Sequence, residues 1–267
     1  MVDLENPILK KSPTINPYRQ AVKNVSERIK WDLNPLSWIS RAQLKKIFNT
    51  HVGEKAIILC NGPSLLKTDF KLLEGIYTFG LNKINLLFDK NEFRPDAIVS
   101  VNSFVIEQNK DFFNTTHIPL FLDSHSTKEI KSRKNVTFFH SDQQVKFARD
   151  VSFSIWQGAT VTSVALQLAF HMGFQEVALV GCDHNFAQSG PANQTVISSD
   201  KDDSHFDPNY FAGGVKWQLP DLVASEYAYS LARETFTAFG RSVYNSTDGG
   251  KLEIFERLPL NKFLGKV

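Results

Sequence analysis

Apolar positions fall into short, uninterrupted runs along most of this chain, separated by polar turns and by segments with a helical period. The clearest runs occupy residues 56–59, 77–80, 96–101, 118–122, 136–139, 176–181, 241–245 and, more briefly, 252–255. Runs without alternation are typical of strands that are buried on both faces of a parallel sheet. Because these strands alternate with helical segments, the pattern predicts a doubly wound, mostly parallel α/β sheet.

The strongest helical period follows the tripeptide Gly158-Ala159-Thr160. Apolar residues recur there at positions 161, 164, 165, 168, 169 and 172, which is the spacing of one helix face. Thr160 or Thr162 is the expected N-cap, and Gly173 is the expected residue just after the helix. A second helix is expected over residues 225–239.

The region before the first strand differs from the rest of the chain. Residues 1–20 are polar and contain three prolines, which favours an extended or disordered arm. Residues 21–49 have a helical pattern that Asn34-Pro35 interrupts. We therefore divide the chain into an N-terminal arm and helical extension, residues 1–50, and a single α/β domain, residues 51–267.

Composition limits the function classes. A chain of 267 residues with 42% hydrophobic and 22% charged content is ordinary for a soluble globular protein. The net charge of +2 is too small to make nucleic acid the main partner. Cys60 and Cys182 form no metal-ligand motif and are interpreted as buried thiols of a reducing compartment.

Membrane-spanning and export signals are not evident in the sequence. No apolar stretch approaches the ~20 residues that cross a bilayer, and the N-terminus lacks the apolar region of a signal peptide. We expect a cytoplasmic protein. Lys and aromatic residues near the N-terminus leave open a weak peripheral contact with the inner face of a membrane, and a homo-oligomer also stays open.

Polar residues follow three of the predicted strands at the point where each ends. Asn61-Gly62-Pro63-Ser64 breaks the first strand, and Asn82 and Asn102 follow the second and third. Open α/β sheets bind ligands at the carboxyl ends of their strands. Amide groups there would suit a base, a ribose or a sugar, although Asn is also common in turns that bind nothing.

A further strand end and a polar loop supply titratable groups. Asp183 and His184 follow the strand at 176–181, and residues 187–204 have the composition of a loop or lid. His205 lies next to this loop with Asp203 and Asp207 close in sequence. Those carboxylates would raise its basicity, so His205 is the best candidate for a general base, with a surface histidine as the alternative. Aromatic residues beside it, Tyr210 among them, would form a sugar platform or anchor the lid.

Taken in order, these motifs resemble a known family over about residues 50–260. The chain is similar to the MptE-like domain family, and also to the bacterial family 42 sialyltransferases. The resemblance rests on Asn61-Gly62-Pro63-Ser64-Leu65 after the first strand, Gly158-Ala159-Thr160 before a long helix, Gly173-Phe174-Gln175-Glu176, Gly181-Cys182-Asp183, Asp203-Ser204-His205-Phe206, and the runs HFDPNYF, WQLPDL and GGKLEIF.

This resemblance implies a Rossmann-like sheet of the GT-A variant type with a lid. It implies inverting transfer of a sialic-acid-like sugar from a CMP-sugar to a glycan or glycolipid acceptor, in bacterial surface polysaccharide or glycoprotein synthesis, with no metal and no cofactor. His205 would be the general base. Asp183 and His184 would complete the catalytic set, and His184 or Tyr210 would steady the leaving phosphate. The expected substrate-binding residues are Asn61, Gly62, Ser64, Asn82, Asn102, Gly158, Ala159, Thr160 and Tyr210.

Two other functions stay open at this stage. One is a hydroxymethylpterin pyrophosphokinase, which would use ATP and Mg²⁺ held by Asp183, Asp202 or Asp203. The other is a non-catalytic subunit that binds a nucleotide sugar.

Overall fold

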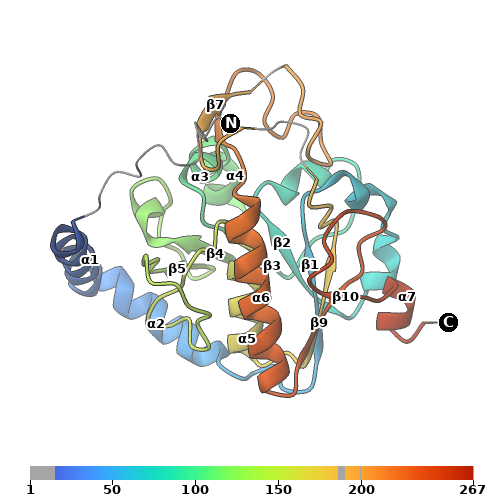
Figure 1. Ribbon diagram of the computed structural model, residues 1–267, viewed down its shortest axis with the longest axis horizontal. Helices are drawn as coiled ribbons and strands as arrows, with labels where there is room; N and C mark the ends of the chain where they lie inside the picture. The colour runs from blue at the N-terminus through green and yellow to red at the C-terminus, as the bar shows by residue number, and fades with distance from the viewer. Residues whose placement is uncertain (1–15, 186–189, 199, 267) are drawn as a thin grey trace, which may run out of the picture.

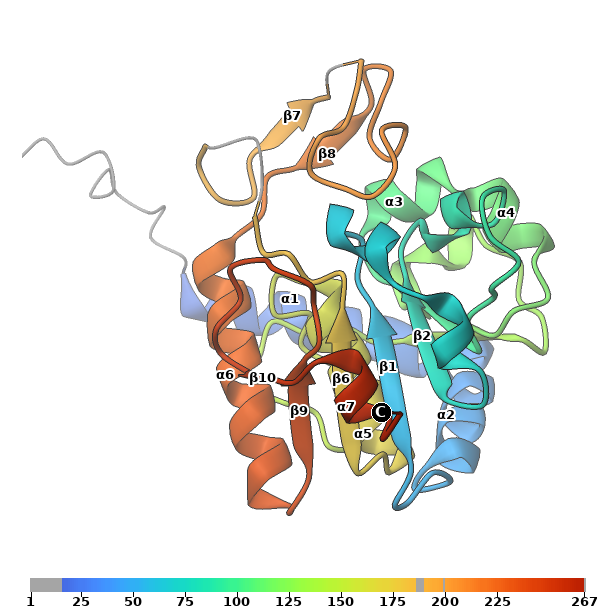
Figure 2. The ribbon, with the colours of Figure 1, turned by 90° about the vertical axis from the view of Figure 1, so that its right-hand side faces the viewer.

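Eight parallel strands form the central sheet (Figures 1 and 2). The computed structural model describes residues 16–185, 190–198 and 200–266, so the arm expected over residues 1–15 lies outside the described residues. The strands are β1 (Lys55–Leu59), β2 (Tyr77–Leu81), β3 (Ala97–Ser100), β4 (Leu120–Asp123), β5 (Val136–Phe139), β6 (Glu176–Val180), β9 (Ser242–Asn245) and β10 (Glu256–Arg257). Their order is β10-β9-β6-β1-β2-β3-β4-β5, and the predicted doubly wound, parallel, Rossmann-like sheet is confirmed.

The strand order reverses at β1. From β1 the chain adds β2, β3, β4 and β5 on one side, and it then returns to place β6 on the other side of β1. Leu59 of β1 is therefore paired with Gly80 of β2 and with Val180 of β6. Neighbouring loops diverge at such a reversal, which leaves a crevice at the carboxyl ends of the strands.

Side chains of β1 point alternately into two cores, which explains why its sequence does not alternate with polar residues. Ala56 and Ile58 pack in the core beneath α2 (Pro35–Ile47), α5 (Val161–Met172) and α6 (Leu222–Ala238). Ile57 and Leu59 pack in the opposite core, with residues of α3 (Ser103–Gln108), α4 (Lys110–Thr115) and α7 (Leu260–Phe263). Figure 1 shows α6 in front of the sheet.

Helix boundaries follow the capping residues in the sequence. Thr160 caps α5 by accepting a hydrogen bond from the backbone N–H of Thr162, and Gly173 ends the helix with φ of 98°. Asn16 and Asn34 cap α1 (Pro17–Asp32) and α2, each followed by a proline. α1 therefore begins within the segment that the sequence predicted to be extended, because proline is well suited to the first position of a helix.

Some elements were not predicted or were placed wrongly. The predicted lid contains two short antiparallel strands, β7 (Thr195–Ile197) and β8 (Lys216–Gln218), above the carboxyl ends of the sheet strands (Figure 2). The strand predicted at residues 252–255 is wrong, because the eighth sheet strand is β10. Short helical turns η2 (Pro63–Lys67), η3 (Phe70–Leu73), η4 (Ile84–Leu87) and η5 (Ser124–Lys128) complete the described elements.

Candidate functional site

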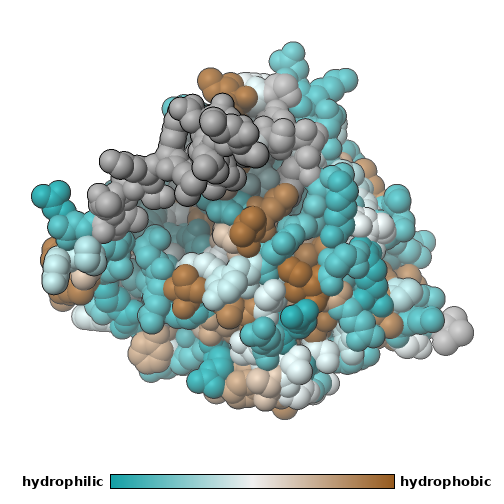
Figure 3. All heavy atoms as spheres, viewed as in Figure 1, coloured by the Kyte–Doolittle hydropathy of each residue, from teal (hydrophilic) through white to brown (hydrophobic). Residues whose placement is uncertain are grey.

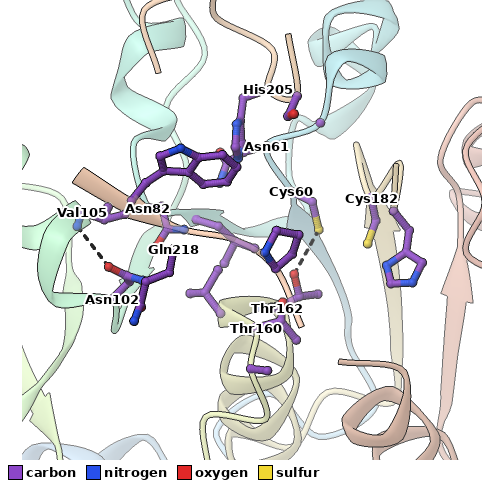
Figure 4. A pocket seen from close by; sticks show the side chains of 18 of the residues that line it. Cys60, Asn61, Asn82, Asn102, Val105, Thr160, Thr162, Cys182, His205 and Gln218 are labelled. Atoms are coloured by element: carbon purple, nitrogen blue, oxygen red, sulfur yellow. Dashed lines mark hydrogen bonds between the residues drawn. The ribbon is translucent and has the colours of Figure 1, made fainter. Parts of the chain in front are cut away.

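A cavity of about 280 Å³ lies between the carboxyl ends of the strands and the lid. Figure 4 shows His205 and Asn61 above it and Thr160 and Thr162 below it. Most of the residues predicted for the site line this cavity: Asn61, Gly62, Asn82, Asn102, Ala159, Thr160, Asp183, His184, His205 and Tyr210. Ser64 and Gly158 are not in its lining.

Ser64 and Gly62 join the turn after β1 to the residue after β6. The backbone N–H and the hydroxyl of Ser64 both donate to Oδ2 of Asp183, at 3.0 and 2.8 Å. A Cβ on Gly62 would lie 2.0 Å from the same oxygen. Ser64 is thus a structural partner of Asp183 instead of a ligand-facing residue, and only glycine fits at position 62.

The three asparagines at strand ends differ in their partners. Asn61 is 8% exposed, and its Oδ1 has no hydrogen-bond partner among the described residues. Asn82, at φ of 49°, accepts a hydrogen bond from the Ser100 hydroxyl at 3.1 Å. Asn102 caps α3 and donates to Gln218 of the lid at 3.4 Å. Since a buried acceptor without a partner is costly, Asn61 is the one of the three best suited to bind a donor group of a ligand.

The turn before α5 is held in shape by its own backbone. Gly158 and Ala159 have φ values of 59° and 57°. A Cβ on Gly158 would also lie 2.6 Å from the Cβ of Ala228, so this residue packs against α6 and does not face the cavity. The Thr160 hydroxyl lies 3.3 Å from the Tyr229 hydroxyl, which places both oxygens beside the first turn of α5.

Two thiols form part of the cavity wall; their burial was predicted from the sequence and is confirmed, but their place in this wall was not predicted. The Cys60 sulfur lies 3.6 Å from the Thr162 hydroxyl, and the Cys182 sulfur lies 3.9 Å from the Tyr229 hydroxyl. The adjacent Cys182 thiol and burial together raise the pKa of Cys60, so Cys60 remains a neutral thiol. Both cysteines end strands that are neighbours in the sheet, and this pairing is visible only once the topology is known.

His205 faces the cavity with a carboxylate behind it. Its Nδ1 lies 2.8 Å from Oδ2 of Asp202, and the two side chains are 13% and 7% exposed. Although burial opposes ionisation, the hydrogen bond and charge of His205 lower the pKa of Asp202. The imidazole also stacks on the ring of Tyr210, with centroids 4.0 Å apart and an angle of 1° between the planes.

The partner of His205 is therefore not one of the two carboxylates expected from the sequence. Asp207 forms an ion pair with Lys90, and the Asp203 side chain is exposed. Asp202 lies three residues before His205, where the chain turns back on itself, and this turn brings the carboxylate to the ring.

A buried lysine holds the lid residues in place. The Lys83 ammonium donates to the backbone carbonyl of Tyr210 at 2.6 Å and to the side chain of Gln108 at 2.7 Å. The side chain of Gln108 in turn donates to the carbonyl of Lys216 in the lid strand β8. Burial lowers the pKa of Lys83 to about 8, partly offset by the charge of Asp202. Sequence reasoning missed Lys83, because a single lysine after a strand has no distinguishing pattern.

His184 lies at the cavity wall in a strained backbone conformation. Its φ is 51°, and its Nε2 lies 3.0 Å from a carboxylate oxygen of Glu226 on α6. His184 and Asp183 both line the cavity, but each is bound to a neighbouring element. Their predicted catalytic roles stay predictions.

A family model described as 6-hydroxymethylpterin diphosphokinase MptE-like matches residues 33–189. The chain belongs to the MptE-like family. A structure of the MAf glycosyltransferase from Magnetospirillum magneticum AMB-1 is similar, with a TM-score of 0.48 and 15% sequence identity. The similarity covers 85% of this chain and 39% of that protein, so this chain spans about two fifths of the other's length. No curated protein matches the chain.

The charges in the cavity wall bear on whether it could bind a triphosphate. Among the residues that the structure describes, the lining includes no Lys and no Arg. They include two carboxylates: Oδ2 of Asp183 accepts from Ser64, and Asp221 caps α6 and accepts from Asn193 at 3.0 Å. Repulsion between phosphate groups would therefore go uncompensated by side-chain cations in this wall.

The carboxylates proposed to hold Mg²⁺ in an MptE-like pyrophosphokinase do not gather at one point. Asp183 lines the cavity, Asp202 is bound to His205, and Asp203 is exposed outside the lining. Over residues 16–185, 190–198 and 200–266, no group of three His, Cys, Asp or Glu side chains could hold a metal ion. The three aspartates named for that role therefore do not form one common set of ligands. A separate finding concerns the helices: within the described ranges, none has the length and hydrophobicity of a membrane span.

Proposed function

We propose that this MptE-like protein is a glycosyltransferase that moves a sugar from a CMP-sugar to a hydroxyl group of a glycan acceptor. The observation that carries the proposal is the pair of His205 and Asp202, with His205 stacked on Tyr210, in the wall of an amide-lined cavity whose described lining has no Lys or Arg. The cavity lies where the strand order reverses, the usual place for nucleotide binding in such sheets.

The proposed chemistry is a single displacement at the anomeric carbon. His205 accepts the proton of the acceptor hydroxyl as its oxygen forms the new glycosidic bond. The bond from the anomeric carbon to the donor phosphate oxygen breaks, and its electron pair leaves on that oxygen. Asp202 orients the imidazole and stabilises its positive charge as the proton arrives. Attack from the side opposite the phosphate inverts the anomeric centre.

The cavity wall favours a donor with one phosphate over donors with two or three. Without Lys or Arg among its described lining residues, the cavity offers a phosphate mainly neutral donors, such as the hydroxyl of Thr160 and the side-chain amides of Asn82 and Gln157. These suit one negative charge better than several. Asn61 Oδ1 is an acceptor that an exocyclic amino group of a base would satisfy.

The direct test is turnover of CMP-sugars with chelator present. The wild-type protein is expected to release CMP from a sialic-acid-like donor when acceptor glycans are supplied. Product stereochemistry, read by nuclear magnetic resonance, is expected to show inversion. Absence of CMP release with every donor, together with intact CMP binding, would favour a non-catalytic nucleotide-sugar-binding subunit.

The family description favours a second candidate, a pterin diphosphokinase. It predicts transfer of a diphosphate from ATP that depends on Mg²⁺. AMP release from ATP with a hydroxymethylpterin as acceptor would establish this second function and overturn the first.

A further inference from the structure

Helix α1 carries an apolar stripe that no described part of the chain covers. The α1 stripe consists of Tyr18, Val22, Val25, Ile29 and, at the C-cap, Leu33. Their side chains are 80%, 69%, 58%, 51% and 73% exposed. Spacings of three and four residues place all of them on one face of the helix. Trp31 lies on the opposite face and is buried against the body of the protein.

Three exposed cations lie along one flank of the α1 stripe. At 3.6 residues per turn, Arg19, Lys23 and Lys30 project about a quarter to a third of a turn away from the centre of the stripe. Lys23 makes a long, exposed ion pair with Glu27 at 3.9 Å, which is worth little in water. Figure 3 shows hydrophobic side chains beside hydrophilic ones over α1, at the left edge of the molecule.

We propose that α1 docks on an anionic lipid surface, with the α1 stripe at the headgroup–acyl boundary and the three cations against lipid phosphates. An apolar stripe bordered by Lys and Arg on an otherwise polar helix is the arrangement of helices that lie in a membrane interface. Trp38 is 61% exposed and donates its indole N–H to the carbonyl of Asp32 at the end of α1. This residue adds a side chain suited to the interface.

A second copy of the chain fits the α1 stripe less well. Two turns of a coiled coil need opposite charges beside the apolar seam. The residues that flank the stripe most closely include one acidic side chain, Asp32, which is already paired with Arg28 and Arg41; the others are Arg19, Ala21, Ser26 and Arg28. Five side chains per copy also fall short of the roughly 1,200 Å² that a stable interface buries. Net positive charge along this helix complements a phosphate surface instead.

Docking through α1 would bring the cavity close to the membrane. Arg28 of α1 donates to the carbonyl of Phe153 at 2.9 Å, and Gln157, four residues later, lines the cavity. The segment 153–157 therefore connects the helix to the cavity wall. Given the proposed transferase function, the acceptor is a membrane-borne glycolipid. This consequence rests on the proposed function, but the docking of α1 does not.

Vesicle flotation of the full chain tests the docking without any activity measurement. The wild-type protein is expected to float with phosphatidylcholine vesicles that contain phosphatidylglycerol, at ~0.1 M salt. It should stay unbound with pure phosphatidylcholine and dissociate at ~1 M salt. Charge reversal at Arg19, Lys23 and Lys30 should weaken partitioning by more than about a hundredfold, because loss of the three cations alone costs roughly one kcal/mol each.

Matched variants distinguish the stripe from general surface effects. Val25→Asp with Ile29→Asp should abolish flotation, while Val52→Asp, at a residue 66% exposed elsewhere, should not change it. Reversal of Lys110, Lys131 and Lys262, all exposed, is the charge control. Melting temperatures should be unchanged in every variant because the altered side chains are exposed.

Two outcomes would overturn the proposal. One is equal flotation of the stripe variants and the wild-type protein. The other is a wild-type dimer in sedimentation that Val25→Asp with Ile29→Asp converts to a monomer, with no flotation at any lipid composition. That outcome would assign the α1 stripe to a second copy. Failure of CMP-sugar turnover would leave the flotation result intact, so the two proposals fail separately.

Discussion

Two histidine–aspartate pairs lie at the carboxyl edge of the sheet, and they differ in what surrounds them. In the lid, His205 Nδ1 is 2.8 Å from Asp202, and the histidine side chain is 13% exposed. After β4, His125 Nδ1 is 2.6 Å from Asp123, and that histidine side chain is 64% exposed. The hydrogen bond is nearly the same, but only His205 lines the cavity and stacks on an aromatic ring.

The carboxylates of the two pairs differ even more than the histidines. Asp123 is 3% exposed and also accepts hydrogen bonds from the Ser141 hydroxyl and from Gln157 at 3.1 Å. It thus connects β4, the segment after β5 and the cavity wall. Its hydrogen bond raises the pKa of the exposed His125. We infer that Asp123 is structural, and that burial against a cavity, more than the pair itself, makes His205 suited to catalysis.

Replacing each histidine in turn is expected to give the largest difference in activity between the two pairs. His205→Ala should lower kcat/KM for the CMP-sugar by about 10²–10⁴-fold, the usual contribution of a general base. His125→Ala should change it by about twofold or less, since exposed side chains away from a site contribute little. Steady-state kinetics on both variants provide the measurement. Similar losses in both would remove the distinction between the pairs.

Replacement of the two aspartates should affect different properties. Asp202→Asn should lower kcat by about 10–10³-fold because an amide cannot stabilise the imidazolium. Asp123→Asn should instead lower the free energy of unfolding by about 2 kcal/mol, since several buried donors lose a charged acceptor. Kinetics and urea denaturation of each variant give both quantities. A stable Asp123→Asn protein with a large kcat loss would contradict the structural role.

Removal of the ring beneath His205 should have a smaller effect. Tyr210→Leu removes the stacking contact, and an aromatic pair contributes about 0.5–1.5 kcal/mol beyond its buried area. A fall of about tenfold in kcat/KM is expected. Tyr210→Phe keeps the ring and is the matched control. Equal losses in Leu and Phe would assign the effect to the hydroxyl.

The pH dependence of stability should reveal the buried lysine that supports the lid. The pKa of Lys83 is lowered to about 8 in the folded protein, below that of an unfolded lysine. The folded state therefore binds fewer protons than the unfolded state between about pH 8 and pH 10, and stability gains at most about 1.4 kcal/mol per pH unit there. This gain is lost as the pH falls through the folded pKa.

The difference in unfolding free energy between the wild-type protein and Lys83→Met isolates that contribution. As the pH rises from 8 to 10, the free energy of unfolding of the wild-type protein is expected to increase relative to that of Lys83→Met. A difference that stays constant over this range would show that Lys83 does not titrate as inferred.

The sequence was sufficient for seven of the eight sheet strands but not for β10 or the lid. Uninterrupted apolar runs predicted the strands, because both faces of a parallel sheet are buried, and the asparagines at strand ends were correctly placed beside one another. The partner of His205 was not predictable, since Asp203 and Asp207 are two positions from His205 and Asp202 is three, and only the turn decides which carboxylate reaches the ring. Strands β7 and β8 were missed because each has three residues in a polar segment.

Calorimetric titration with nucleotides tests the central proposal most directly. CMP is expected to bind the wild-type protein in the presence of chelator, with ATP binding much more weakly in the presence or absence of Mg²⁺. Asn61→Ala should weaken CMP binding by about tenfold, the effect of one lost hydrogen bond. Binding of ATP with Mg²⁺, and no binding of CMP, would contradict the assignment of this cavity to a CMP-sugar.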